Sequence, residues 1–517
     1  MVTYSPFRVA AFTAILVVII QKLPKILKLL RRTGFKALIL QKILNLSMRI
    51  SYFRNQYIKK DQYVRESLQH MFLSSRNDPI HTLPTEGQKF VLNKLKNWAK
   101  RDEKLQNNGR LSGTIYHSSS YFNEIAVEAL KMFTFSNPLH PEVFPAVRQM
   151  ESELVQMTIN LLNGGPQVCG VLTNGGTESI LLAVLAYREW GRKNGISEPE
   201  IIVPDTFHAS VFKAGYYFGV SIIVVKVDSV TRKVNPRDIR KQINSSTVAI
   251  FASAPNYTNG IIDPIEELGN LASLFSINFH VDACLGGFLL PFLQESGFEV
   301  DKIDFRLKGI TSVSSNLCKY GYCPKGVGVL MFASSELRRL AYFCLPDWSG
   351  GVYVTPTTTG SRPGLNSVAA WATLMSIGRA GYIQYTTEVV RSAQFIKNES
   401  IKIEGIEVVG DPLLTVIAFE SRQFNIHAIG NAMTKIGNWG ITHLQNPDGI
   451  HFQVTLANAH SAKHFVEDLR KAVLEVEIDP DAGQYETAAL YGMIAETRDK
   501  NVVAEISKHF ADCLFTA

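Results

Sequence analysis

Short apolar runs alternate with segments of helical spacing from Gln167 onward. The apolar runs are Val168–Leu172, Ile201–Val203, Ser221–Val227, Thr247–Ala252 and Ile277–Val281, and the helical segments are Glu178–Trp190, Ala209–Phe218 and Ile265–Phe275. Strands that alternate with helices form a mostly parallel sheet covered on both faces. Ligands of such sheets bind beyond the carboxyl ends of the strands. The pattern therefore predicts an α/β fold with a ligand site at that edge.

At its N-terminus the chain has an uninterrupted run of twelve mostly apolar residues, Val9–Ile20. The run is shorter than the roughly 20 residues of a comfortable membrane span, but flanking Arg8 and Lys22 extend it because long polar side chains reach the headgroups. The basic residues that follow predict a single-pass anchor with the rest of the chain facing the cytosol. A basic amphipathic helix over Leu23–Ile50, lying on the membrane surface, is the second interpretation and an organelle presequence the third.

The alternation of strands and helices ends near Arg379–Tyr385. A helix to about Lys397 then leads into a smaller C-terminal α+β domain, with Val408–Phe419 and Ile450–Leu456 as its antiparallel strands. Four regions are therefore expected: a membrane anchor and basic segment over 1–60, an N-terminal helical segment over 61–135, a large domain over 136–385 and a small C-terminal domain over 386–517.

Charge and cysteine content exclude several classes of protein. The net charge of +7 arises from residues 1–60, which carry twelve Lys or Arg and no acid, and the remaining chain has 41 basic and 46 acidic residues. The body of the protein is therefore not expected to bind nucleic acid. The six cysteines are scattered, which indicates reduced thiols rather than a disulfide framework. No nearby Cys or His pair completes a zinc site with Cys318 and Cys323, so no metal is expected.

Four candidate groups follow the predicted strands, and the first is the turn Gly175-Gly176-Thr177. Glycines let the backbone approach a ligand closely, and the amides that open a helix favour a phosphate. Without a following Gly-Lys-Ser/Thr, the turn is not a nucleotide-binding P-loop. Taken alone, it is more simply a tight turn with a threonine cap.

The other three groups are a histidine, a carboxylate and a lysine. His208 follows a strand and could stack on a cofactor ring, although a lone histidine there is more often structural. Asp282 ends a strand and could pair with a ring nitrogen, or cap a loop. Lys319 could form a Schiff base through an uncharged amine, with Lys325 as a neighbouring cation or a ligand for a substrate phosphate. Each signal is weak, but their order along the chain predicts a site for pyridoxal 5′-phosphate.

Several further segments make the chain resemble the sphingosine-1-phosphate lyases, which are pyridoxal-phosphate enzymes of fold type I. The resemblance runs from about Ser112 to the C-terminus. The segments are Ser112-Gly-Thr-Ile-Tyr116, Phe135-Ser-Asn137-Pro-Leu-His140-Pro-Glu-Val-Phe144-Pro, Asn163-Gly-Gly-Pro166, Thr177-Glu-Ser, His280-Val-Asp-Ala-Cys-Leu-Gly-Gly-Phe288, Lys319-Tyr-Gly-Tyr-Cys-Pro-Lys325-Gly and Gly360-Ser361-Arg362-Pro363-Gly364. The segments at 137–140 and 360–364 are more particular to the lyases than the lysine and the turn, which related decarboxylases share.

The resemblance implies a role for each matching residue. Lys319 would bind the cofactor, Asp282 would pair with its ring nitrogen and His208 would stack on the ring, while Gly176 and Thr177 hold its phosphate. Gly360 and Ser361 would reach the cofactor phosphate of a neighbouring subunit, which implies a homodimer with shared active sites. The substrate side would be lined by Tyr116, Asn137, His140, Lys325 and Tyr353.

The implied reaction is a retro-aldol cleavage of a phosphorylated long-chain base. Its products would be a long-chain aldehyde and phosphoethanolamine, and an anchor in the endoplasmic reticulum membrane, with the catalytic domain in the cytosol, suits a substrate that partitions into bilayers. The chain departs from the family beside the lysine: Asn316-Leu317-Cys318 stands where these lyases usually have Asp-Thr-His, and Asn259 where a histidine is common. An amino-acid decarboxylase of the same fold, or a weakly active or non-catalytic paralogue, therefore stays open.

Overall fold

The computed structural model describes residues 88–106, 109–117, 120–479 and 500–514. The predicted anchor and basic segment over residues 1–60 lie outside this part of the chain. Within the described ranges, no helix is both long enough and apolar enough to cross a membrane. The chain divides into two compact units, one of residues 94–489 and one that combines 1–93 with 490–517. The second unit contains α17 (Lys500–Cys513), and the first contains both larger sheets and the site.

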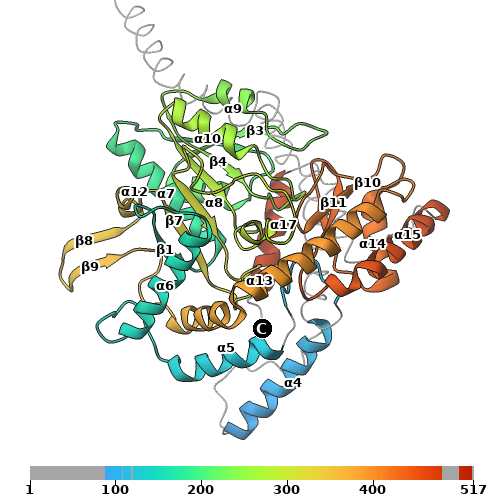
Figure 1. The fold of residues 1–517 in the computed structure, drawn as a ribbon, viewed down its shortest axis with the longest axis horizontal. Coiled ribbons are helices and arrows are strands. Elements are labelled where there is room, and N and C mark those ends of the chain that lie inside the picture. The colour runs from blue at the N-terminus through green and yellow to red at the C-terminus, as the bar shows by residue number, and fades with distance from the viewer. Residues whose placement is uncertain (1–87, 107–108, 118–119, 480–499, 515–517) are drawn as a thin grey trace, which may run out of the picture. The chain divides into compact units, whose positions relative to one another are not determined.

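A seven-stranded sheet forms the centre of the 94–489 unit (Figure 1). Its strands lie in the order β1-β7-β6-β5-β4-β2-β3. The five strands from β3 to β6 pair in parallel, whereas β7 is antiparallel to both β6 and β1. The sheet is therefore mixed but mostly parallel, as predicted. The bounds are β1 Cys169–Thr173, β2 Glu200–Pro204, β3 Ser221–Val225, β4 Thr247–Ser253, β5 Asn278–Asp282, β6 Ser312–Ser315 and β7 Gly328–Phe332.

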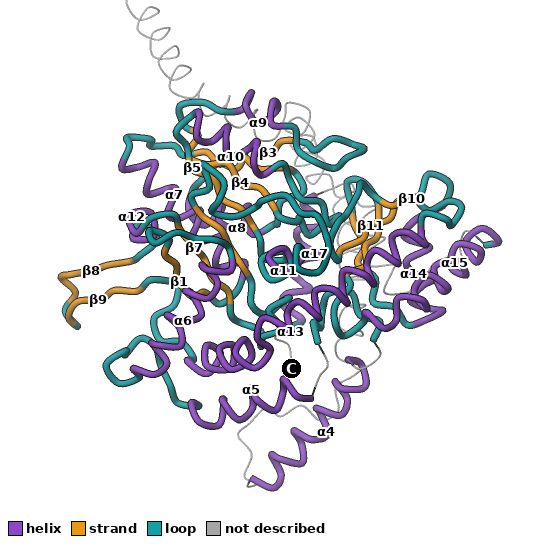
Figure 2. Tube along the Cα trace, viewed as in Figure 1, coloured by secondary structure: helices purple, strands orange, loops and turns teal. Residues whose placement is uncertain are grey.

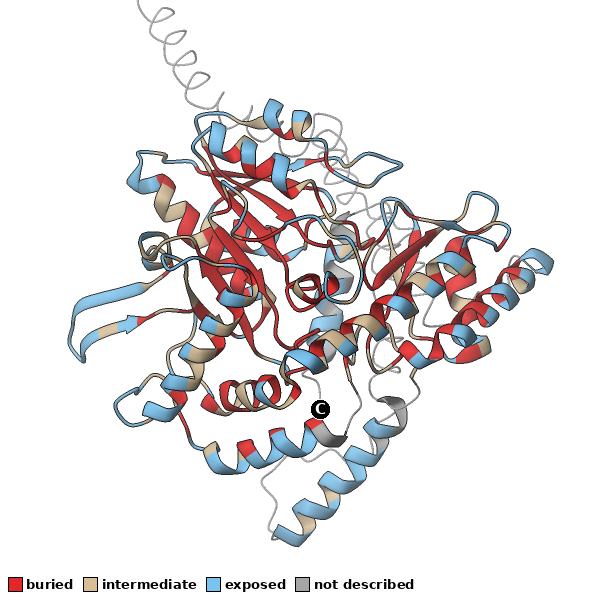
Figure 3. Ribbon diagram, in the orientation of Figure 1, coloured by how far each residue is buried: buried red, intermediate tan, exposed pale blue. Residues whose placement is uncertain are grey.

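Both faces of this sheet are buried, which is why β2, β3, β4 and β7 are mostly apolar, whereas β5 and β6 also carry buried polar side chains. In β2, Ile202 packs into one hydrophobic cluster, while its neighbours Ile201 and Val203 pack into the other. Alternate side chains of a strand point to opposite faces, so the two clusters cover the two faces. Helices α7 and α8 contribute to the second cluster, and α6, α10 and α13 to the first. Figure 3 shows the buried residues concentrated along the strands.

The helices of this unit connect and cover the strands (Figure 2). α4 (Gln88–Gln106) crosses the boundary between the two units along the chain. The others are α5 Ser120–Phe133, α6 Pro145–Leu161, α7 Gly176–Lys193, α8 Ser210–Phe218, α9 Pro236–Gln242, α10 Ile265–Leu274, α11 Leu290–Leu293, α12 Ser335–Arg339, α13 Gly364–Ser400, α14 Ile426–Gly437, the short 3₁₀ helix η1 Ala459–Ser461 and α15 Ala462–Ile478. The predicted helices over 178–190, 209–218 and 265–275 correspond to α7, α8 and α10.

A four-stranded antiparallel sheet follows α13, in the order β10-β11-β13-β12. Its strands are β10 Glu407–Val408, β11 Val416–Glu420, β12 Thr442–Leu444 and β13 Gly449–Gln453. The predicted single strand over Val408–Phe419 is wrong, because the chain leaves the sheet between β10 and β11. Gly410 adopts a left-handed φ of +61° there, and Pro412 cannot donate to a strand ladder.

Two further features concern the predicted domain limits and the surface. The predicted boundary at 385/386 falls within α13, whose helical geometry is interrupted at Gly378 (φ 61°, ψ 175°). The division into four regions stays a prediction. Before α13, β8 (Phe343–Trp348) and β9 (Gly351–Thr355) form a hairpin that extends away from the large sheet (Figure 1). Phe343, Trp348 and Val352 on this hairpin are 54%, 53% and 73% exposed.

Candidate active site

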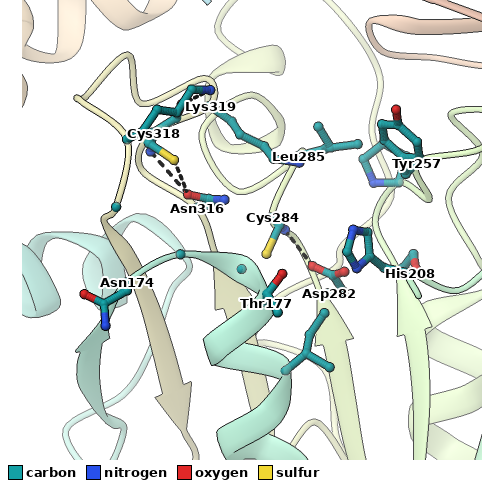
Figure 4. A pocket seen from close by; sticks show the side chains of 17 residues that line it. Asn174, Thr177, His208, Tyr257, Asp282, Cys284, Leu285, Asn316, Cys318 and Lys319 are labelled. Atoms are coloured by element: carbon teal, nitrogen blue, oxygen red, sulfur yellow. Dashed lines mark hydrogen bonds between the residues drawn. The ribbon is translucent and has the colours of Figure 1, made fainter. Parts of the chain in front are cut away.

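A cavity of about 280 Å³ lies where the carboxyl ends of the strands meet. Residues at or shortly after the carboxyl ends of β1, β2, β4, β5 and β6 line it, as expected for a sheet of this kind. Figure 4 shows Lys319, Cys318 and Asn316 on one side of the cavity, with His208 and Asp282 on the other. The predicted residues that the structure brings together here are Gly176, Thr177, His208, Asp282, Lys319 and Lys325.

The Gly175–Thr177 turn joins β1 to α7 with its backbone against the cavity. Gly175 has a φ of +125°, a conformation that favours glycine. A Cβ on Gly176 would lie 2.7 Å from Cys284 Sγ, so a side chain does not fit at this position. The first amides of an α-helix have no partner within the helix. The turn therefore offers backbone donors and the positive end of α7 to an anionic group.

Asp282 is the last residue of β5 and is 7% exposed. Its Oδ1 accepts a hydrogen bond from the Cys284 amide at 3.0 Å and another from Ser314 Oγ at 3.1 Å. Because an ionised carboxylate only accepts hydrogen bonds, these two donors suit the charged form. Both donors reach Oδ1, which leaves Oδ2 for a ligand in the cavity.

His208 lies on the same side of the cavity as Asp282 (Figure 4). Its Nδ1 accepts a hydrogen bond from the Ser210 amide at 3.2 Å, so the ring proton is placed on Nε2. Burial lowers the pKa of His208, the nearby carboxylate of Asp282 opposes this shift and the charge of Lys319 adds to it. The ring also meets Tyr257 edge-on, with centroids 6.4 Å apart. A neutral, flat side chain of this kind suits an aromatic ligand.

Lys319 lies in a turn that follows β6. Its amide approaches the Asn316 carbonyl at 3.3 Å, and its own carbonyl accepts from the Tyr322 amide at 3.0 Å. The unusual neighbours of the lysine contact each other, because Asn316 Oδ1 accepts from the Cys318 amide at 3.3 Å and from the Cys318 thiol at 2.9 Å. Both residues line the cavity, so the departure from the family pattern changes the wall beside the lysine.

Lys325 brings a second amine to the cavity. Its Nζ lies 4.6 Å from the centroid of the Tyr116 ring and donates to the Cys318 carbonyl at 3.4 Å. Burial lowers the pKa of Lys325, and the charge of Lys319 lowers it further. Tyr116 itself does not line the cavity, but it is buried behind Lys325, and its hydroxyl accepts from Gln453 at 3.0 Å.

Six of the predicted site residues lie outside this cavity: Tyr116, Asn137, His140, Tyr353, Gly360 and Ser361. Asn137 donates to Ser361 Oγ at 3.1 Å, and a Cβ on Gly360 would lie 2.6 Å from the Tyr353 hydroxyl. His140 is exposed, 3.3 Å from Glu142. The substrate and partner-subunit roles of these residues stay predictions.

Sequence reasoning overlooked several residues at the site. Ser253, the last residue of β4, and Tyr257, in the loop that follows it, line the cavity where the same strand-end rule would have found them. Glu178 gave no signal beyond its place in the first turn of α7. Its buried carboxylate accepts from the Asn174 amide at 2.6 Å, from the Thr358 amide at 3.0 Å and from the Thr358 hydroxyl. Glu178 thereby ties the glycine turn to the segment that carries Gly360 and Ser361.

Comparison with known proteins agrees with this geometry. Residues 114–422 match the pyridoxal-dependent decarboxylase conserved domain. Sphingosine-1-phosphate lyase 1 of Rattus norvegicus is 42% identical over 450 residues, which cover 86% of this chain and 79% of that protein. This chain belongs to the sphingosine-1-phosphate lyase family. The sphingosine-1-phosphate lyase of Arabidopsis thaliana is 38% identical and covers 93% of this chain and 89% of its own length.

Solved structures show that this chain has the fold of type I pyridoxal enzymes. The sphingosine-1-phosphate lyase of Burkholderia pseudomallei superimposes with a TM-score of 0.76 at 36% identity, over 83% of this chain and 99% of its own. The glutamate decarboxylase of Lactobacillus brevis has a TM-score of 0.66 at 20% identity, covers 81% of this chain and 98% of its own, and shows the fold alone. The predicted family, fold type and cofactor class are confirmed.

Proposed function

We propose that this chain cleaves phosphorylated sphingoid bases to a long-chain aldehyde and phosphoethanolamine, using pyridoxal 5′-phosphate. The observation that carries the proposal is the convergence of Lys319, Asp282 and the Gly175–Thr177 turn on one cavity. This chain is 42% identical to sphingosine-1-phosphate lyase 1 of Rattus norvegicus, which supports the choice of substrate.

The cavity residues fit the cofactor in kind. Lys319 would hold it through its amine, Asp282 would accept a hydrogen bond from the ring nitrogen, and the turn at Gly176 and Thr177 would hold its phosphate. The absence of a side chain at Gly176 and the backbone amides that open α7 are what a phosphate needs. When bound, pyridoxal phosphate supplies an electron sink for the pair left by the broken carbon–carbon bond.

The remaining residues bind the substrate and shape the cavity. Lys325 carries a cation to the cavity, where it would bind the substrate phosphate. His208 would cover one face of the aromatic cofactor. Its neutral form avoids placing a second charge beside Lys319, whose amine has to be uncharged to act as a nucleophile.

The full chain, purified in detergent, tests this proposal by its absorbance and by aldehyde release from a phosphorylated long-chain base. Lys319→Ala should abolish both the cofactor band and aldehyde release. The matched control Lys463→Ala, which removes an exposed lysine from α15, should keep both. A wild-type band without aldehyde release would reject the lyase assignment, and carbon dioxide release from amino acids would then indicate a decarboxylase, the function suggested by the matched domain.

The assembly that we propose is a homodimer with shared active sites. Gly360 and Ser361 do not line the cavity of their own chain, and the neighbouring hairpin exposes apolar side chains that a second subunit would cover. Ser361→Asp would place a like charge beside the partner's cofactor phosphate, so mixing Lys319→Ala with Ser361→Asp should restore part of the aldehyde release if the sites are shared across subunits. Mixtures no more active than either variant alone would argue for independent sites.

We also propose that the N-terminal segment anchors the chain in the endoplasmic reticulum membrane with the catalytic domain in the cytosol. The support is the apolar run Val9–Ile20 and the basic residues after it. In sealed microsomes, protease added outside should digest the catalytic domain. Protection of that domain, or release of the intact chain by high salt, would contradict the proposal.

A further inference from the structure

A chain of buried polar side chains runs from Asp282 away from the cavity. Ser314 Oγ lies 3.1 Å from Asp282 Oδ1 and 3.2 Å from His280 Nε2. His280 Nδ1 lies 2.7 Å from Ser312 Oγ, which is 2.5 Å from the Tyr187 hydroxyl. The four residues of this chain, Ser314, His280, Ser312 and Tyr187, have no solvent exposure. The chain therefore links α7 to the strand end that carries the carboxylate, through β5 and β6.

The charge on Asp282 sets the direction of every hydrogen bond in this chain. A carboxylate only accepts, so the single hydroxyl proton of Ser314 points to Asp282. Ser314 Oγ must then accept from His280, which places the imidazole proton on Nε2. Burial lowers the pKa of His280 to about 4, so the ring is neutral near pH 7 and its Nδ1 is an acceptor. Ser312 consequently donates to His280.

The last bond follows in the same way. Because the proton of Ser312 is used on His280, the oxygen of Ser312 accepts from the Tyr187 hydroxyl. Tyr187 in turn has Thr311 Oγ1 at 2.7 Å. From Tyr187 to Ser314, each group thus donates toward Asp282; Thr311 lies outside this run, because its hydroxyl donates to the Phe279 carbonyl at 3.1 Å. With the imidazole proton on Nδ1 instead, the Ser314 proton would be drawn to His280 and Asp282 would lose its side-chain donor.

We propose that Tyr187, Ser312, His280 and Ser314 are positioning residues that form a polarised hydrogen-bond relay, which holds the carboxylate of Asp282 turned toward the ring nitrogen of the cofactor. The proposal rests on the cofactor assignment above. Aligned hydrogen bonds in a buried setting strengthen one another. Both donors to Asp282 reach Oδ1, so the relay fixes one oxygen and leaves Oδ2 for the ring nitrogen. A relay of this kind acts on the cofactor through Asp282 and touches no substrate.

The imidazole tautomer gives a direct test that needs neither substrate nor cofactor. In the full chain with ¹⁵N-labelled histidine, the His280 resonances are identified by comparison with His280→Gln. The relay predicts a neutral ring at pH 7 with its proton on Nε2. A proton on Nδ1, or a charged ring, would overturn the proposal, because either state reverses or breaks the direction toward Asp282.

The second test compares two ligands that differ only at the ring nitrogen. Pyridoxal 5′-phosphate and its 1-deaza analogue, which has C–H in place of that nitrogen, are loaded separately and their release is followed by absorbance. Ser314→Ala removes a hydrogen bond to a charged group, so it should release pyridoxal 5′-phosphate about tenfold faster. Release of the deaza analogue should not change, because Asp282 has no ring partner there.

Controls separate a relay from mere structural support. Ser315→Ala removes a buried hydroxyl on the same strand that has no hydrogen-bond partner, so it should change neither release rate. Tyr187→Phe cuts the far end of the relay and should accelerate release of the nitrogen-containing ligand less than Ser314→Ala does. It also keeps the test available if Ser314→Ala fails to fold. Equal acceleration for both ligands would overturn the relay and leave these residues with a packing role.

Failure of the relay can be distinguished from failure of the proposed lyase function. Wild-type protein that binds the cofactor but releases no aldehyde would refute the lyase assignment and leave the relay intact, since both tests measure the ring nitrogen and its partner. Wild-type protein that binds no pyridoxal 5′-phosphate would remove the cofactor assignment and the relay together.

Discussion

Replacing Glu178 with glutamine should loosen the segment around Thr358. One carboxylate oxygen of Glu178 accepts from the Asn174 amide and the other from the amide and hydroxyl of Thr358. The amide group of glutamine has only one oxygen, so its NH₂ must face one of these two backbone donors. Whichever orientation is adopted, a buried N–H loses its acceptor.

The expected magnitude follows from the hydrogen bonds that the substitution removes. A hydrogen bond to a charged group contributes about 1.5–3 kcal/mol, and leaving a buried donor unpaired costs about 1–3 kcal/mol. We therefore expect Glu178→Gln to reduce the free energy of local opening around Asn174 or Thr358 by about 2–4 kcal/mol. Glu178→Ala, which removes the acceptor for all three donors, should have a larger effect.

Hydrogen–deuterium exchange followed by mass spectrometry measures this local change. Peptides covering 174–178 and 355–361 should exchange at least about tenfold faster in Glu178→Gln, since 1.4 kcal/mol corresponds to a factor of ten. Glu336→Gln is the matched control, because Glu336 lies in the first turn of α12 but is exposed, and its substitution should change exchange little. Unchanged exchange in both peptides of Glu178→Gln would refute the reasoning that Glu178 joins the two segments.

Three further predictions concern stability. Burial raises the pKa of Asp263 to about 7, so between about pH 4 and 7 the folded state keeps a proton that the unfolded state releases. The free energy of unfolding of the wild type, measured by denaturant titration, should therefore fall relative to Asp263→Asn over that range, by up to about 4 kcal/mol, and the two should run parallel above it. Tyr320→Phe removes three hydrogen bonds to Thr415, Gln453 and Val454, in or beside the four-stranded sheet, and should cost about 2–4 kcal/mol, whereas Tyr322→Phe, which removes a buried hydroxyl without a partner, should not destabilise; equal thermal shifts would contradict this. Gly260→Ala puts a Cβ 2.3 Å from the Val416 carbonyl at a φ of +73°, so a soluble variant with wild-type circular dichroism and melting temperature would refute the predicted clash.

Local signals in the sequence were sufficient for much of the fold. The apolar runs at 168–172, 201–203, 221–227, 247–252 and 277–281 correspond to β1 to β5, because strands of a sheet covered on both faces need apolar residues on both faces. The strand-end rule also located Lys319, Asp282, His208 and the glycine turn. The failure at Val408–Phe419 came from treating one apolar stretch as one strand, although Gly410 and Pro412 break the ladder within it.

By itself, the sequence determined the class of fold, the family and the six predicted residues that line the cavity, because burial and strand ends leave a local pattern along the chain. Only the tertiary structure decided which distant residues support them. Glu178 pairs with Thr358 across 180 positions, and Tyr187 reaches Asp282 through side chains of β5 and β6. Such pairs depend on how helix and sheet pack together, and no spacing in the chain records that.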